Sequence, residues 1–299
     1  MKNLYKILIF TLMLILAACT EDIVIDIEEG EPLMGVEAYL TDELKQHETI
    51  LSRTADFYNS DEIEMVSGAT VFVTDGVDTI YYLEDLEQRG HYFTEPVAGR
   101  KKTLYTLYVD VPDVTEADGY QHYRAESWLP DNAEGIDSVV FLPFQSYLPL
   151  PDTMYGLYPF FQSLDDPSIN YMVDVARNDT LRTDTLTDKN VVSTAGYAGY
   201  YINGEEFLKE NMMMPVTLYS TKKLKEGDRY TVWLSSITSE YMSYILEVQF
   251  SNGSNPLMGA PSNVSTNIQP AGKAVGWFSA ASVISAETVY HEPQKKPLD

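Results

Sequence analysis

The chain has 299 residues, of which 45 are acidic and 20 are basic, so its formal net charge at pH 7 is −25. A net charge this negative repels nucleic-acid phosphates and disfavours docking on anionic lipids through basic patches, so we expect no nucleic-acid partner. Hydrophobic residues make up 44% of the sequence, which is enough for a core and excludes a chain that is disordered throughout. The length allows one large domain or two ordinary ones.

Residues 1–18 read as a secretory signal. Two lysines precede an apolar run at 7–16, which at about ten residues is too short to span a bilayer as a helix but suits a signal peptide. The run ends in Leu-Ala-Ala-Cys at 16–19, which resembles a bacterial lipobox. The resemblance implies that Cys19 is acylated, becomes the first mature residue and anchors the chain to a membrane by lipid.

The alternative is an ordinary signal peptide with a chance cysteine near its cleavage site. Cys19 is the only cysteine in the sequence and stands where a lipobox requires it, so we favour lipidation. A lone cysteine also excludes an internal disulfide framework and a cysteine-rich metal site.

Residues 19–33 form an acidic tether. Glu21 and Asp22 follow the cysteine closely and resemble the signal that sends lipoproteins of Bacteroidota to the outer face of the outer membrane. The alternative is that this pair only belongs to a solvated acidic segment. The resemblance implies a lipid-anchored outer-membrane protein that faces the cell exterior.

From residue 34 onward the pattern predicts an all-β fold. Short segments rich in Val, Tyr, Phe and Thr are separated by Gly, Pro and Asp, which is typical of a β-sandwich. The Asp75-Gly76 pair predicts a hairpin turn. We expect an N-terminal sandwich at 34–130, with strands at 36–40, 49–53, 69–74, 79–83, 91–93, 103–109 and 120–128.

Part of this predicted domain has a recognisable sequence pattern. The segments 66–73, 90–93 and 99–109 resemble the transthyretin-like sandwich of carboxypeptidase regulatory domains and of plug extensions of outer-membrane receptors. That resemblance implies a binding or scaffolding module without a catalytic centre of its own.

A polar stretch at 130–135 leads into a second predicted sandwich at 134–290, followed by a tail at 291–299. Both sandwiches would be immunoglobulin-like or transthyretin-like. The second differs by one short helix, expected at about 239–251, because apolar residues recur there with helical spacing. The other expected elements are strands at 136–141, 170–176, 200–207, 215–219 and 228–234.

Residues 141–161 combine four prolines with many aromatic side chains. Because proline lacks an N–H, we expect neither a central strand nor a helix through this segment. One interpretation is that the segment packs over a sheet or between the domains. The other is an exposed surface for a ligand or partner, since aromatic rings give a large contact area at low entropic cost. Its centre would be Tyr155, Tyr158, Phe160 and Phe161.

The order of these signals resembles a Bacteroidota outer-membrane lipoprotein family known as domain of unknown function 4249. The resemblance covers nearly the whole mature chain and is carried by the lipobox with its acidic tether, 36–42, 66–73, 203–205, Tyr241-x-x-Tyr244, 262–268 and Gly276-Trp277-Phe278-Ser279-Ala280. It implies a surface lipoprotein that accompanies a TonB-dependent receptor.

The sequence holds no motif for catalysis. Its four histidines lack the spacing of metal ligands, and the acidic residues at 113–118 lack the layout of a calcium-binding EF-hand loop. Glu205 and Glu206 would point to opposite faces of a strand. We therefore expect no cofactor, no metal and no enzymatic activity.

Two function classes remain. The first is a binding accessory of a TonB-dependent receptor in nutrient capture or uptake, with 141–161 contributing to the ligand or receptor surface. The alternative is a structural or adhesive module of the cell surface that carries no transported ligand.

Overall fold

The structure is a computed structural model that describes residues 32–54, 63–144, 152–161, 164, 166, 168–183, 185–193, 217–252 and 264–292. Over these residues the fold is all-β and sandwich-like, as predicted, with one large mixed sheet and one smaller sheet. The helices are α3 (Ser239–Asn252) and the short 3₁₀ helix η1 (Leu186–Asp188). The strands are β1 (Met34–Thr41), β2 (Glu48–Arg53), β3 (Thr70–Thr74), β4 (Thr79–Glu84), β5 (His91–Thr94), β6 (Thr103–Pro112), β7 (Tyr120–Leu129), β8 (Ser138–Phe144), β9 (Met154–Phe160), β10 (Ile169–Arg177), β11 (Thr180–Leu181), β12 (Asn190–Ser193), β13 (Thr217–Ser220), β14 (Arg229–Thr238) and β15 (Ala274–Val289).

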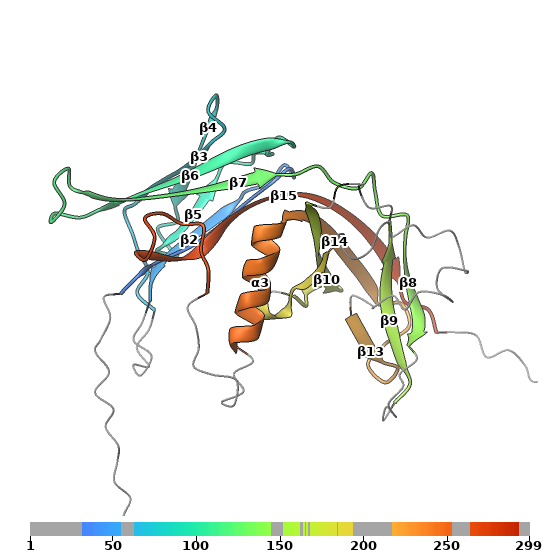
Figure 1. Ribbon diagram of the computed structural model, residues 1–299. Coiled ribbons are helices and arrows are strands. Elements are labelled where there is room, and N and C mark those ends of the chain that lie inside the picture. Colours follow the sequence, from blue (N-terminus) through green and yellow to red (C-terminus); the bar gives the residue numbers. More distant parts are fainter. Residues whose placement is uncertain are drawn as a thin grey trace, which may run out of the picture. The chain divides into compact units, whose positions relative to one another are not determined.

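The larger sheet has twelve strands in the described part of the chain (Figure 1). Its order is β11-β10-β14-β15-β1-β2-β5-β4-β3-β6-β7, with β12 also paired to β10. A second sheet has the order β13-β9-β8. The predicted hairpin is present, because β3 pairs with β4 and Thr74 lies opposite Thr79. Gly76 adopts a φ of 87° in that turn, a conformation that glycine enters without a steric cost.

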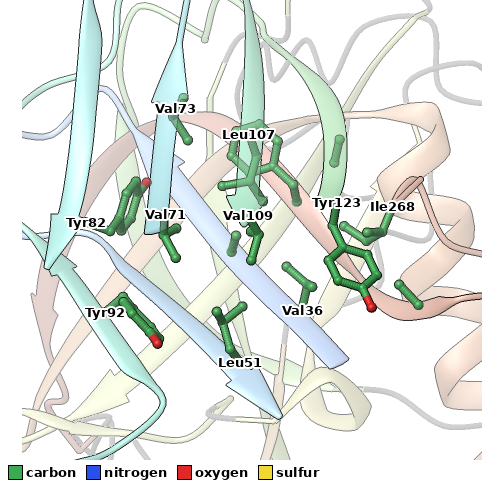
Figure 2. Close-up of a cluster of buried hydrophobic side chains, with 14 of the residues drawn as sticks. Val36, Leu51, Val71, Val73, Tyr82, Tyr92, Leu107, Val109, Tyr123 and Ile268 are labelled. Carbon is green, nitrogen blue, oxygen red and sulfur yellow. The ribbon is translucent and has the colours of Figure 1, made fainter. Parts of the chain in front are cut away.

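Alternation of apolar and polar residues builds the first core. In β1 every second side chain is buried, and the same holds in β6. Successive side chains of a strand point to opposite faces, so these residues share one side of the sheet. Figure 2 shows the result: Val36 of β1, Leu51 of β2, Leu107 and Val109 of β6, and Ile268, which precedes β15, gather in one cluster.

Strand β15 lies within the larger sheet and pairs with β14 on one side and β1 on the other. Its residues 274–281 pair in parallel with β1, and residues 282–289 pair antiparallel with β14. Phe278 is fully buried in the first core, whereas Ile284 packs against a second core. The division into sandwiches at 34–130 and 134–290 stays a prediction, and β15 belongs structurally to both of the predicted regions.

Helix α3 confirms the helix predicted at 239–251. Its first turn is capped by Thr238, whose Oγ1 accepts a hydrogen bond from the Tyr241 N–H at 3.3 Å. Tyr241 and Ile245 are buried on one face of the helix, in a cluster that includes Trp277 of β15. The rings of Tyr244 and Trp277 stack with their centroids 5.0 Å apart, so this face fixes the helix to the larger sheet.

The expectation that prolines exclude a central strand from 141–161 is wrong for β9. This strand lies between β13 and β8 and contains Pro159. Among the described residues, β13 pairs with residues 154–157 of β9, and Pro159 lies opposite Val139 of β8, one residue before β9 ends. Pro143 lies on β8, at the edge of this small sheet, where a missing N–H is tolerated.

Candidate functional site

Three predicted site residues lie outside the described residues. They are Cys19, the expected lipidation site, and Glu21 and Asp22, the expected export signal. The predicted strand at 200–207 and the pair Glu205-Glu206 also lie outside them.

The structure places the predicted aromatic surface on β9 and directly after it. Tyr158, Phe160 and Phe161 are buried, with exposed fractions of 6%, 8% and 6%, and Tyr155 is half-buried. The ring of Phe161 contacts that of Tyr171 edge-on at 5.0 Å between centroids. Burial also raises the pKa of the Tyr158 hydroxyl. These four side chains are at least partly buried, as expected if the segment packs over a sheet. Their use as a surface for a ligand or partner stays a prediction.

A pocket of about 450 Å³ lies where β7 ends and α3 begins. Trp128 lines it with 45% of its surface exposed, and Ser168, Ser239 and Glu240 add hydrogen-bonding groups. Small-molecule sites combine apolar surface with a few polar groups in volumes of roughly 300–1,000 Å³. This pocket therefore has the size and lining of a candidate ligand site.

Electrostatic contacts fix one wall of this pocket. The Lys102 Nζ lies 2.7 Å from the Asp131 Oδ2, and the hydrogen bond from this ammonium lowers the pKa of the Asp131 carboxyl. On the opposite side, the Ser168 backbone N–H and hydroxyl both donate to the Asp166 Oδ1, at 2.9 Å and 2.6 Å. The pocket thus carries carboxylate groups that can accept hydrogen bonds from hydroxyl groups of a ligand.

Sequence reasoning did not single out Trp128, although a signal for it exists. In β7 the odd-numbered residues from 123 to 129 are buried and the even-numbered ones from 120 to 128 are exposed or half-exposed. Trp128 falls on the polar face. A large aromatic residue on the solvent side of an alternating strand indicates a candidate binding surface.

The histidines do not come together. Each pairs separately, His47 with the Val97 carbonyl, His91 with Glu48, His122 with Asp110 and Asp118, and His291 with Glu226. Across the residues that the structure describes, no group of three or more His, Cys, Asp or Glu side chains has an arrangement that could hold a metal ion. The Asp113 carboxylate instead accepts hydrogen bonds from Thr115, which lower its pKa and order the turn after β6.

We expect His122 to titrate at a higher pH than His47. Hydrogen bonds to Asp110 and then Asp118 raise the pKa of His122, whereas burial lowers that of His47. The favourable contact of the His122 imidazolium is therefore present at low pH and lost as the pH rises through its folded-state pKa. An NMR titration of the ring protons checks this order. D110N and D118N should each lower the pKa of His122 and leave His47 unchanged, and the reverse order of the two histidines would contradict the prediction.

No helix among the described residues has the length and apolar character needed to cross a membrane.

The fold defines the class of protein first: an all-β, sandwich-like protein with one helix packed on its large sheet. The model of the family described as "Domain of unknown function (DUF4249)" matches residues 20–287, and the chain belongs to this family. No curated protein matches it. A solved structure titled "Cytokine receptor complex - Crystal form 1A" is similar over 69% of this chain and 86% of that chain, with 10% sequence identity and a TM-score of 0.23. A likeness that weak carries no argument about fold or function.

Proposed function

We propose that this protein is a surface-exposed lipoprotein of the outer membrane that acts as a binding accessory of a TonB-dependent receptor in nutrient capture or uptake. The observation that carries the proposal is the lipobox at 16–19, which follows a short apolar run and precedes the acidic pair Glu21-Asp22. A lipid on Cys19 would hold the folded chain at a membrane, because buried acyl chains supply the free energy of anchoring.

The described fold has a feature that supports a binding role. It supplies a large sheet, and a pocket with the exposed indole of Trp128 among carboxylates and hydroxyls. Such a pocket can hold a small molecule by apolar contact and hydrogen bonds without a reaction centre. The link to a TonB-dependent receptor comes from the family resemblance.

Replacing Cys19 should abolish membrane anchoring. In cells fed radioactive palmitate we expect the native chain to be labelled and to sediment with the outer membrane, whereas C19A is unlabelled and soluble, because no thiol remains to be acylated. The matched control E21Q/D22N keeps Cys19 and should stay labelled. If the acidic pair directs export, that control should lose accessibility to protease added outside the cell. Membrane-bound C19A would contradict the proposed anchor.

The receptor link is tested by affinity capture of the tagged, lipidated protein from native outer membranes, followed by mass spectrometry. Stoichiometric recovery of a TonB-dependent receptor supports the accessory role. Recovery of the protein alone favours the structural or adhesive alternative. The C19A variant serves as the control for proteins that bind the tag or the resin.

A further inference from the structure

A second pocket, of about 440 Å³, opens where β10 turns into β11, and its lining is strongly basic. One acidic residue, Asp228, lines it together with five cationic ones: Arg177, Arg182, Lys222, Lys223 and Lys225. The whole chain has only 20 basic residues against 45 acidic ones, so a quarter of its cations gather at this one place. Like charges repel, and this concentration therefore needs a physical reason.

The wall of this basic pocket is held by contacts inside the protein. Asn178 and Asp179 form a two-residue turn in which both residues have positive φ, 48° and 64°, as a type I′ hairpin turn requires. The Asn178 Nδ2 donates to the Asp228 Oδ1 at 2.7 Å, and the Arg229 N–H donates to the Asn178 Oδ1 at 2.9 Å. The Arg229 guanidinium also donates to both Asp179 carboxylate oxygens. These contacts order the turn beside the pocket.

Ion pairs among the described residues neutralise part of this positive charge. Arg177 pairs with Asp228 and lies over the Tyr230 ring, 5.8 Å from its centroid. Lys222 pairs with Asp152 at 2.5 Å. Among the residues that the structure describes, Arg182, Lys223 and Lys225 have no carboxylate within ion-pair distance, and all three are exposed.

The field of these cations extends to the core beneath the pocket. Burial raises the pKa of Tyr230 to about 12, and the positive charges of Arg177 and Arg182 act against that rise. The same two arginines also oppose the rise that burial gives the pKa of Tyr219. An anion bound above the arginines would relieve this excess of positive charge.

We propose that the basic pocket binds the phosphate or sulfate ester group of a small soluble molecule. Guanidinium groups offer paired N–H donors and ammonium groups offer compact charge, a combination that suits a tetrahedral oxyanion. The volume admits a ligand of about the size of a sugar. The Debye length is about 8 Å at physiological salt, so a small anion interacts mainly with the pocket cations. A long polyanion would also reach the acidic surface around them.

This inference deepens the proposed function, on which its biological meaning rests, by naming a ligand class for the accessory. Binding itself needs neither the receptor nor the acyl chain. A soluble ester can therefore bind even if the receptor link fails, and the receptor can be captured even if no ester binds.

Isothermal titration of the purified mature protein in neutral detergent tests the inference, with glucose 6-phosphate, glucose 6-sulfate and glucose as probes. We expect the two esters to bind, glucose not to bind, and added salt to weaken the binding of the esters. K223A/K225A should raise the Kd of the esters at least tenfold. The control K45A/R89A removes the same charge at exposed positions outside the pocket and should change the Kd less than twofold. Equal weakening in both variants, or no binding of either ester, overturns the proposal.

Two further measurements keep this result interpretable. Lys223 and Lys225 are exposed and lack a described ion-pair partner, so the double variant should keep the Tm of the native protein. R182Q removes a guanidinium group instead of two ammonium groups, and it should also weaken ester binding. Micelles containing phosphatidylglycerol test a lipid headgroup as the source of the phosphate. Binding to these micelles that depends on the pocket, without binding of the soluble esters, would overturn the assignment to a soluble ligand.

Discussion

Replacing Gly276 with alanine is expected to bring the protein close to unfolding at room temperature. Gly276 lies on β15 opposite Val36 of β1 and has a φ of 95°. A Cβ at this position would lie 2.1 Å from the Val36 carbonyl oxygen and 2.8 Å from its carbonyl carbon. The contacted atoms are backbone, so they can yield only if the parallel pairing of β1 with β15 opens.

The expected loss for G276A has two sources. A non-glycine residue at strongly positive φ costs about 1–3 kcal/mol, and an overpacked site adds about 1–3 kcal/mol or more. We therefore expect the free energy of unfolding to fall by about 4 kcal/mol, most of the stability of a domain near the lower end of the usual 5–15 kcal/mol. Urea unfolding followed by circular dichroism measures the loss.

A second glycine isolates the clash. Gly272 also has a positive φ, 75°, but an added Cβ there would meet no atom within 4 Å. G272A should therefore lose only the conformational term, about 1–2 kcal/mol. If G276A and G272A lose equal stability, the proposed contact with β1 is not what requires glycine at residue 276.

Replacing Asn132 with aspartate is expected to cost about 3 kcal/mol or more at neutral pH. Asn132 is 4% exposed and lies in the connection between β7 and β8. Its Nδ2 donates to the Leu234 carbonyl oxygen at 3.1 Å and to the Ser282 carbonyl oxygen at 2.6 Å, which ties the connection to β14 and β15. Its Oδ1 accepts from the Ala133 N–H at 2.8 Å. A carboxylate would lose both donated bonds and face two carbonyl oxygens with an unpaired buried charge.

The cost of N132D should depend on pH. Burial beside carbonyl oxygens raises the pKa of the new carboxyl group in the folded state above its unfolded value of about 3.9. The folded state then binds more protons than the unfolded state, so stability relative to the native protein falls as the pH rises from about 4 toward the folded-state pKa. Urea midpoints of both proteins at pH 4 and pH 7 give this difference. N132A loses both donated hydrogen bonds and also the one accepted from Ala133, but it has no titrating group, so its loss of stability should be the same at pH 4 and pH 7. If N132D loses the same stability relative to the native protein at pH 4 and at pH 7, the expected burial of charge is contradicted.

Local signals in the sequence were sufficient for much of the fold. The Asp75-Gly76 pair predicted the β3–β4 hairpin because its contribution is local: Gly76 adopts a positive φ, and the Asp75 carboxylate accepts hydrogen bonds from the Val77 and Asp78 N–H groups. The helical spacing of Tyr241, Tyr244 and Ile245 predicted α3 to within one residue, since a 3.6-residue period is visible within a single segment.

Features that depend on distant segments were not accessible in this way. The pairing of Met34 with Ala274 joins the two ends of the described chain, and no periodicity within either strand specifies its partner. The same limit applies to the basic pocket, because Arg182 follows β11 of the larger sheet and Lys223 follows β13 of the smaller one.

The position of β15 has a consequence for when this protein can fold. The parallel neighbour of β1 is formed by residues 274–281 of β15. This pairing can therefore form only after those residues have been synthesised. Contacts between residues so far apart are slow to form, because the long intervening loop must close first. In a chain exported as proposed here, the pairing of β1 with β15 would therefore form only after residues 274–281 have crossed the inner membrane.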